Sequence, residues 1–140
     1  MILGVRVLVV DDAAHWRKFV NFILRIDPGL EIIAEADSGY EALKKAEQLQ
    51  PAVVLLDIGL PEMSGIEVCR RMLSRNPETR VVFVTQETDA DIVYEALRTG
   101  AAAFVAKIDA ASQLVTAVHS ALKNKVFLSR SLPPTLGTTQ

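Results

Sequence analysis

Disulfide-forming cysteines, long apolar runs and a strong net charge are all missing from this chain of 140 residues, and each absence excludes a class of protein. The single cysteine, Cys69, cannot form an internal disulfide, which favours a reducing cytoplasm. The longest apolar stretches are too short to span a membrane, and the N-terminus lacks the pattern of a signal peptide. A net charge of -2 argues against a domain that wraps nucleic acid. We therefore expect a cytoplasmic protein that contacts neither a membrane nor nucleic acid directly.

The composition is that of one folded domain. Half of the residues are apolar and 23% are charged, which is typical of a globular protein and not of a disordered one. A chain of this length buries about two thirds of its unfolded surface around one core. From Ser129 onward the sequence SRSLPPTLGTTQ loses its periodicity and gathers proline, threonine and serine. We expect a domain over residues 1–128, followed by a linker or disordered tail over residues 129–140.

Apolar runs and helical patterns alternate along the chain. Five short runs rich in valine, isoleucine and leucine do not alternate with polar residues, which indicates strands buried on both faces. They cover about residues 5–10, 30–35, 52–56, 80–84 and 103–106. Apolar residues recur at helical spacing near 16–24, 42–49, 66–73, 92–97 and 114–122. This alternation predicts an α/β fold, a doubly wound five-stranded parallel sheet with helices on both faces.

Capping residues mark where several of these helices begin and end. Ser38 with Glu41, and Ser64 with Glu67, fit the capping box that satisfies free amides at a helix start. Gly100 stands where the helix near 92–97 needs a left-handed terminator. These signals agree with the boundaries that periodicity predicts.

Four of the apolar runs stop at a reactive or hydrogen-bonding group. The residues concerned are Asp11, Asp12, Asp57, Thr85 and Lys107. In a doubly wound sheet the carboxyl ends of the strands meet at one crevice, so these side chains are expected to share a site. Taken singly, each is better explained as a turn, a cap or a solvated side chain. Their coincidence at four strand ends favours function.

The chemistry of this set points to a divalent cation and a phosphoryl group. Carboxylates about 5 Å apart repel by roughly 3 kcal/mol per pair at an effective dielectric near 20. A hard cation relieves that repulsion, and oxygen ligands without a neighbouring histidine or second cysteine favour Mg²⁺ or Mn²⁺. An aspartate beside such an ion can attack phosphorus and form an acyl phosphate. Lys107 and the Thr85 hydroxyl would then hold the phosphoryl oxygens.

With these motifs in place, the chain resembles the response-regulator receiver domains of two-component signalling over residues 5–125. The resemblance lies in the acidic pair after the first strand, DIGLPEMSG after the third, threonine after the fourth and FVAK at the fifth. It implies a flavodoxin-like strand order, 2-1-3-4-5. It also implies that Asp57 is the phosphoacceptor. The Mg²⁺ ligands would be Asp12, Asp57 and the Gly59 carbonyl, with Asp11 acting through a metal-bound water. Thr85 and Lys107 would be phosphate-binding and switch residues, and Phe104 would be the switch aromatic.

Two positions depart from the common pattern. Receivers often carry a cis proline after the lysine, but here Ile108 follows, and we expect a trans bond because a cis non-proline bond costs about 3 kcal/mol. Two short patterns resemble the LuxR/FixJ-like subfamily: lysine, any residue and then aspartate at 107–109, and FLSR at 127–130. Gln86 is longer than the usual residue after the threonine and would narrow access to Asp57.

The resemblance implies a signalling protein, not an enzyme. A sensor histidine kinase would phosphorylate Asp57, and the surface of the helix near 92–97, strand 103–106 and the helix near 114–122 would change. The output would be a helix-turn-helix transcriptional domain absent from this chain; the alternative is a stand-alone receiver acting by protein contact. A homodimer is expected through the helices near 16–24 and 114–122, or through the switch surface itself. The remote alternative is a metal-dependent phosphatase or a flavodoxin-like enzyme on the same fold. Such an enzyme requires a glycine-rich phosphate loop or a second catalytic acid near the nucleophile, and neither follows the first or third predicted strand.

Overall fold

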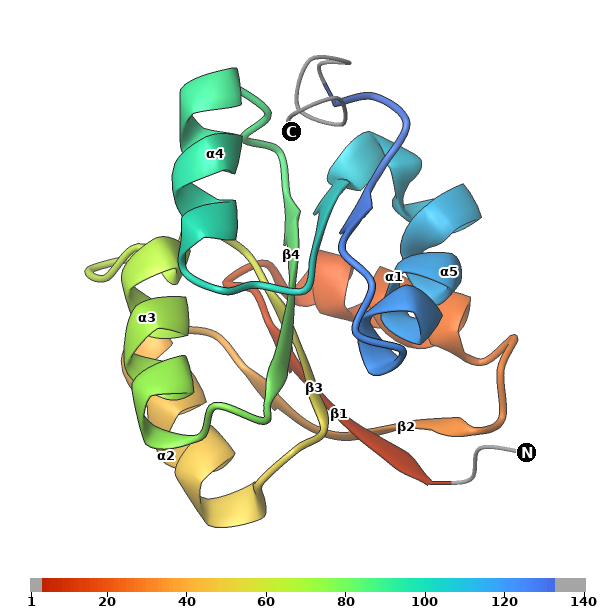
Figure 1. Cartoon of the computed structure of the whole chain (residues 1–140). Coiled ribbons are helices and arrows are strands. Elements are labelled where there is room, and N and C mark those ends of the chain that lie inside the picture. Colours follow the sequence, from red (N-terminus) through yellow and green to blue (C-terminus); the bar gives the residue numbers. More distant parts are fainter. Residues whose placement is uncertain (1–3, 133–140) are drawn as a thin grey trace.

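The computed structural model describes residues 4–132, in which strands and helices alternate as predicted (Figure 1). The strands are β1 (Val5–Val10), β2 (Leu30–Ala36), β3 (Val53–Leu56), β4 (Arg80–Thr85), β5 (Ala103–Ala106) and β6 (Phe127–Leu128). The helices are α1 (Ala14–Leu24), α2 (Gly39–Leu49), α3 (Gly65–Arg75), α4 (Ala90–Arg98) and α5 (Ala110–Leu122). A short 3-10 helix, η1 (Lys107–Asp109), joins β5 to α5.

The sheet is parallel, and its order is β2-β1-β3-β4-β5-β6. The predicted order of the first five strands is confirmed, but the predicted count of five is wrong. A strand of two residues is too short to leave a periodic pattern in the sequence. It forms because the open edge of β5 offers backbone partners: the Phe127 N–H donates to the Ala102 carbonyl at 3.3 Å, and the Ser129 N–H donates to the Phe104 carbonyl at 3.0 Å.

Helices cover both faces of the sheet, so the strands are buried from two sides. Helices α1 and α5 pack on one face, and α2, α3 and α4 pack on the other (Figure 1). Along β1, Val7 and Val9 belong to the first core while Leu8 and Val10 belong to the second. This is why the strands read as continuous apolar runs. None of the helices within residues 4–132 has the length and hydropathy needed to cross a bilayer.

The predicted helix caps are confirmed in part. At α2 the Ser38 Oγ accepts a hydrogen bond from the Glu41 N–H at 3.2 Å, and the Glu41 carboxylate accepts from the Asp37 N–H at 2.9 Å. At α3 the Ser64 Oγ accepts from the Ile66 N–H at 3.1 Å, but Glu67 does not complete a capping box. Arginines one turn farther along α3 compete for the Glu67 carboxylate, and it bonds both of them, at 2.9 Å each.

The end of α4 is confirmed as the sequence predicts it. Gly100 has a φ of +99°, a left-handed conformation that side chains disfavour, and its N–H donates to the Leu97 carbonyl at 3.1 Å. The peptide bond between Lys107 and Ile108 is trans, since the described chain contains no cis bond. The departure from proline at position 108 therefore leaves an ordinary backbone, with the Ile108 side chain exposed.

The chain beyond β6 continues to pack against the domain as far as Leu132. We call Ser129–Leu132 the C-terminal segment. Ser129 and Leu132 are buried, and Leu132 joins the core that contains Phe104. The Ser129 Oγ accepts from the Ala106 N–H at 2.9 Å. The packed structure thus extends four residues past the boundary expected at 128, and the remainder of the expected tail, 133–140, lies outside the described residues.

Asp109 fastens this segment to η1. Its carboxylate accepts hydrogen bonds from the Ser131 N–H at 2.8 Å and the Ser131 hydroxyl at 2.7 Å. Burial raises the pKa of Asp109, but the hydrogen bonds from Ser129 and Ser131 outweigh it, so the pKa lies below the ordinary value. The ionised carboxylate is therefore the form that the fold stabilises.

Asp109→Ala is expected to lower the free energy of unfolding by about 2 kcal/mol near neutral pH, because two hydrogen bonds to a charged acceptor are lost. The depressed pKa means that this contribution is complete above the unfolded-state value of about 3.9 and disappears as pH falls through the folded-state value. Denaturant unfolding at several pH values measures it.

Ser112→Ala is the matched control, because the Ser112 hydroxyl donates to the Asp109 backbone carbonyl, at 3.3 Å, and not to its carboxylate. An Asp109→Ala loss no larger than the control, or one that stays constant down to the lowest pH, contradicts this role.

Candidate functional site

Three acidic side chains meet at the carboxyl ends of β1 and β3. The backbone places two of them, because the Asp11 N–H donates to the Ala36 carbonyl at 3.0 Å and the Asp57 N–H donates to the Val10 carbonyl at 3.1 Å. One carboxylate oxygen from each of Asp11, Asp12 and Asp57 lies within 4.8 Å of the other two. Within the described part of the chain, no other trio of histidine, cysteine or acidic residues comes this close. The predicted clustering is confirmed.

The three carboxylates differ in exposure and in partners. Asp11 is 1% exposed and Asp57 is 7% exposed, whereas Asp12 faces solvent. The Asp11 Oδ1 accepts from the Ala13 N–H at 2.9 Å, and the Asp57 Oδ1 accepts from the Gly59 N–H at 3.3 Å. The Asp11 Oδ2 is buried without a well-aligned hydrogen bond. The neighbour of this oxygen is the ammonium of Lys107 and not a backbone amide.

Lys107 brings a positive charge against two of the carboxylates. Its Nζ lies 2.8 Å from the Asp11 Oδ2 and 3.4 Å from the Asp57 Oδ2, and its side chain is 14% exposed. Three carboxylates and one ammonium leave a formal charge of -2 when all are ionised. The pKa of Asp11 lies above its ordinary value, mainly because the carboxyl group is buried. The nearby charge of Asp57 raises this pKa further, whereas the hydrogen bonds from Lys107 and the Ala13 amide lower it. The single ammonium of Lys107 therefore does not balance the negative charge of the three carboxylates.

These residues fit a hard divalent cation. Carboxylate oxygens are the ligands that Mg²⁺ and Mn²⁺ prefer, and Mg²⁺ characteristically takes only one or two carboxylates from a protein. The solvent-exposed Asp12 leaves the cluster open on one side, where water or a phosphoryl oxygen could complete a coordination shell. The closeness of the three acids, with only one ammonium beside them, agrees with that donor set.

A close backbone approach shapes the loop that follows Asp57. The Gly65 N–H donates to the Ile58 carbonyl at 2.8 Å, which brings the start of α3 against the loop that follows Asp57. A Cβ at position 65 would lie 2.0 Å from the Asp57 carbonyl oxygen, so only glycine fits. A Cβ at Gly59 would have no neighbour within 4 Å.

Thr85 and Phe104 lie where the strand order places them, but the Thr85 hydroxyl is not hydrogen-bonded to any of the three carboxylates. The Thr85 hydroxyl is buried and accepts from the Glu87 N–H at 3.2 Å. Phe104 is fully buried, with its ring centroid 5.9 Å from that of Phe83. The ring of Phe104 therefore points into the core in this structure. Gln86 is exposed and lies on the rim of a hollow of about 430 Å³ that Thr85, Lys107 and Ser131 also line.

Two neighbours of the site, Arg17 and Trp16, carry no sequence signal that would have identified them. The Arg17 Nη1 donates to the Asp11 carbonyl at 2.6 Å and its Nε donates to Glu35 at 2.8 Å, which fixes the end of β1. The Lys107 Nζ lies 4.8 Å from the centroid of the Trp16 ring. In the sequence Trp16 fits only an apolar helix face.

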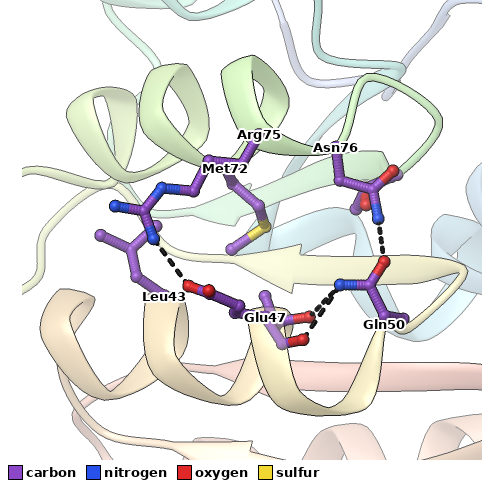
Figure 2. Close-up of a pocket in the computed structure, with 8 residues that line it drawn as sticks. Leu43, Glu47, Gln50, Met72, Arg75 and Asn76 are labelled. Carbon is purple, nitrogen blue, oxygen red and sulfur yellow. Dashed lines mark hydrogen bonds and ion pairs between the residues drawn. The ribbon is translucent and has the colours of Figure 1, made fainter.

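A second hollow, of about 390 Å³, lies between α2 and α3 at the amino ends of the strands (Figure 2). Its polar groups are paired with each other: the Arg75 Nη1 donates to Glu47 at 2.7 Å, and the Asn76 amide donates to the Gln50 side chain at 2.5 Å (Figure 2). Because the charged and amide side chains of this hollow are engaged with each other, the carboxylate cluster is the stronger candidate site. Cys69 is also set aside, since burial raises the pKa of its thiol to about 11.

The fold and the site together define a doubly wound α/β protein with an acidic pocket and one lysine at its carboxyl edge. The sequence profile of the response regulator receiver domain matches residues 7–119, and the chain belongs to that family.

Similar proteins agree with this assignment. The response regulator GacA of Pseudomonas viridiflava is 35% identical over 125 residues, which are 89% of this chain and 58% of GacA. This chain thus spans little more than half the length of that relative. The chemotaxis protein CheY of Listeria monocytogenes is 33% identical over 118 residues, 84% of this chain and 98% of CheY. The signal receiver domain of NarL from Mycobacterium tuberculosis superposes with a TM-score of 0.81 and 35% identity, covering 86% of this chain and 98% of that one.

Gly65→Ala is expected to destabilise the domain by about 3 kcal/mol, because the added methyl collides with the Asp57 carbonyl and the loop must move. Thermal unfolding measures the change. Gly59→Ala is the matched control in the same loop and should change the free energy of unfolding by well under 1 kcal/mol, since its Cβ meets open space. Equal effects of the two substitutions would refute the close approach.

Proposed function

We propose that Asp57 accepts a phosphoryl group from the phosphohistidine of a sensor histidine kinase, with Mg²⁺ or Mn²⁺ bound at the adjacent acids. The observation that carries the proposal is the meeting of Asp11, Asp12 and Asp57 within 4.8 Å, with Lys107 against two of them. Membership of the receiver family supports it. The product is a signalling state of the domain and not a released metabolite, so we do not class the protein as an enzyme.

Asp12, Asp57 and the Gly59 carbonyl would hold the metal directly, and Asp11 would hold it through a water. When bound, the cation supplies positive charge that draws phosphoryl oxygens toward the carboxylates and offsets their repulsion. An oxygen of the Asp57 carboxylate then forms a bond to phosphorus as the bond between phosphorus and the histidine nitrogen of the kinase breaks. The Lys107 ammonium, 3.4 Å from Asp57, is close enough to turn toward the new phosphoryl oxygens.

The switch begins at Thr85. Its hydroxyl accepts a hydrogen bond from the Glu87 N–H, so its own proton is the one it would donate to a phosphoryl group on Asp57. Phe104 is buried in this structure, so its inward rotamer is already available and would be held in place once Thr85 moves. The surface of α4, β5 and α5 then changes by a shift between two packed arrangements.

The output we favour is a helix-turn-helix transcriptional domain beyond the end of this chain. Lys107, Ile108 and Asp109 form the subfamily pattern, and the relative GacA extends well beyond the matched region. The alternative is a stand-alone receiver acting by protein contact. CheY favours it, because the matched region covers 98% of that protein.

A second copy of the chain is the partner we propose for the outer face of α1. Phe22 is 70% exposed and Ile26, which follows α1, is 77% exposed, one helical turn apart. Phe19, at 38%, extends the same patch. Apolar side chains in a row on one helix suit an interface that pairs α1 and α5 of two copies better than they suit solvent. The surface of α4, β5 and α5 is the alternative interface.

Incubation with acetyl phosphate and Mg²⁺ is expected to add one phosphoryl group to the intact protein, and Asp57→Asn should abolish that gain because the nucleophilic oxygen is lost. Intact-protein mass spectrometry measures it. Asp37→Asn, an exposed acid outside the cluster, is the matched control and should react as the wild type does. Uptake by Asp57→Asn at the wild-type level contradicts the assignment.

Millimolar Mg²⁺ should raise the melting temperature by about 3–6 °C, because the cation binds the folded carboxylate cluster and not the unfolded chain. Asp12→Asn should reduce that rise by at least half, while Asp37→Asn should leave it intact. Differential scanning calorimetry with and without Mg²⁺ provides the measurement. A melting temperature of the wild-type protein that stays the same when Mg²⁺ is added would count against metal binding.

A further inference from the structure

The Lys107 ammonium has a third neighbour besides its two carboxylates. The face of the Trp16 ring lies 4.8 Å from the Lys107 Nζ, measured to the ring centroid. A cation at that distance from an indole face is attracted by the negative face of the ring. The ring also covers one side of a lysine whose side chain is only 14% exposed, and the displacement of water strengthens its pairing with the acids.

The ring is held in place by the same residue that pairs with the lysine. The Asp11 carboxylate accepts from the Ala13 N–H at 2.9 Å, and the backbone N–H of Trp16 donates to the Ala13 carbonyl at 3.1 Å, so the first turn of α1 is tied to Asp11. The Phe19 ring supports the indole, with the two centroids 5.1 Å apart and the planes inclined by 52°. Asp11, the α1 turn, Trp16 and Lys107 thus form a closed chain of contacts.

The lysine sits unevenly between its two acids. It is 2.8 Å from Asp11 but 3.4 Å from Asp57, the proposed phosphoacceptor. To engage a phosphoryl group on Asp57, the ammonium must pivot away from Asp11. A hydrogen bond would resist that pivot because it is directional. The attraction between the ammonium and the ring face weakens only gradually as the ammonium shifts over the ring, so the ring can hold the ammonium while it turns from Asp11 toward Asp57.

We infer that Trp16 is a positioning residue for Lys107, which guides its ammonium between Asp11 and a phosphorylated Asp57. The inference rests on the proposed phosphorylation of Asp57. Because Trp16 is the sole tryptophan of the chain, its fluorescence reports directly on the lysine beside it.

The first test is fluorescence of the full chain with Mg²⁺, before and after addition of beryllofluoride, a mimic of a phosphoryl group. The wild-type emission is expected to change when the ammonium moves over the ring. Lys107→Met should remove the change while the protein still gains stability from Mg²⁺. A wild-type emission that does not respond, or a response of the same size in Lys107→Met, overturns the inference.

The second test compares the initial rate of phosphoryl uptake from acetyl phosphate among variants. Trp16→Leu keeps an apolar side chain but loses the ring face, and it should slow uptake by about three- to thirty-fold. Trp16→Phe restores a ring and should stay within about threefold of the wild type. Tyr40→Leu removes an exposed aromatic from α2 and is the matched control, with an unchanged rate.

The role of Trp16 must also depend on the lysine. In the Lys107→Met background, Trp16→Leu should cause no further slowing, since the ring then has no ammonium to hold. Equal slowing in both backgrounds indicates a merely structural residue and overturns the inference. If the wild-type protein takes up a phosphoryl group but none of these lysine-dependent effects is seen, the role of Trp16 is overturned and the proposed function stands. A wild-type protein that takes up no phosphoryl group overturns the proposed function, and this inference falls with it.

Discussion

Repulsion among three carboxylates, held together by the backbone of a parallel sheet, is the constraint on which the rest of this structure depends. Oxygens of Asp11, Asp12 and Asp57 lie within 4.8 Å of each other, a separation at which each ionised pair repels by about 3 kcal/mol. A flexible chain would let these side chains part. Here the first and third strands are paired, so Asp11 and Asp57 stay close together, and positive charge or a bound proton relieves their repulsion. Lys107 supplies part of it, and the cluster remains ready to take more from solution.

The surrounding fold keeps that arrangement rigid and open. Gly65 lets the start of α3 approach the Asp57 carbonyl, and Arg17 binds the Asp11 carbonyl from α1. The C-terminal segment lies beside the same edge, because Ser129 bonds the Ala106 amide directly before Lys107. Lys107 thus contacts the acids through its side chain, and its neighbour Ala106 binds Ser129 of the C-terminal segment.

Most of the fold and the cluster itself could be predicted because the signals are local. Buried strands appear as unbroken apolar runs, and in a parallel sheet their ends must meet, so Asp11, Asp57 and Lys107 could be brought together across the sequence. The α/β alternation predicts the layers in the same way.

Features that depend on tertiary contacts could not be predicted. The strand β6 is two residues long and exists only because β5 has an open edge. Ser129 and Ser131 occur in a composition typical of linkers, yet Asp109 and the Ala106 amide give them partners. Glu67 has the spacing of a capping residue, but two arginines on its own helix bind it instead. Trp16 has the spacing of a core residue, and only the fold reveals the lysine above its ring.

The most direct test of the account is a titration with Mn²⁺, followed by electron paramagnetic resonance of the free ion. The account predicts one site per chain that Mg²⁺ displaces competitively, and that weakens sharply when Asp57 and Asp12 are both changed to asparagine. Binding that survives in this double variant, or the absence of any saturable site at millimolar metal, would contradict the claim that these acids form a cation site.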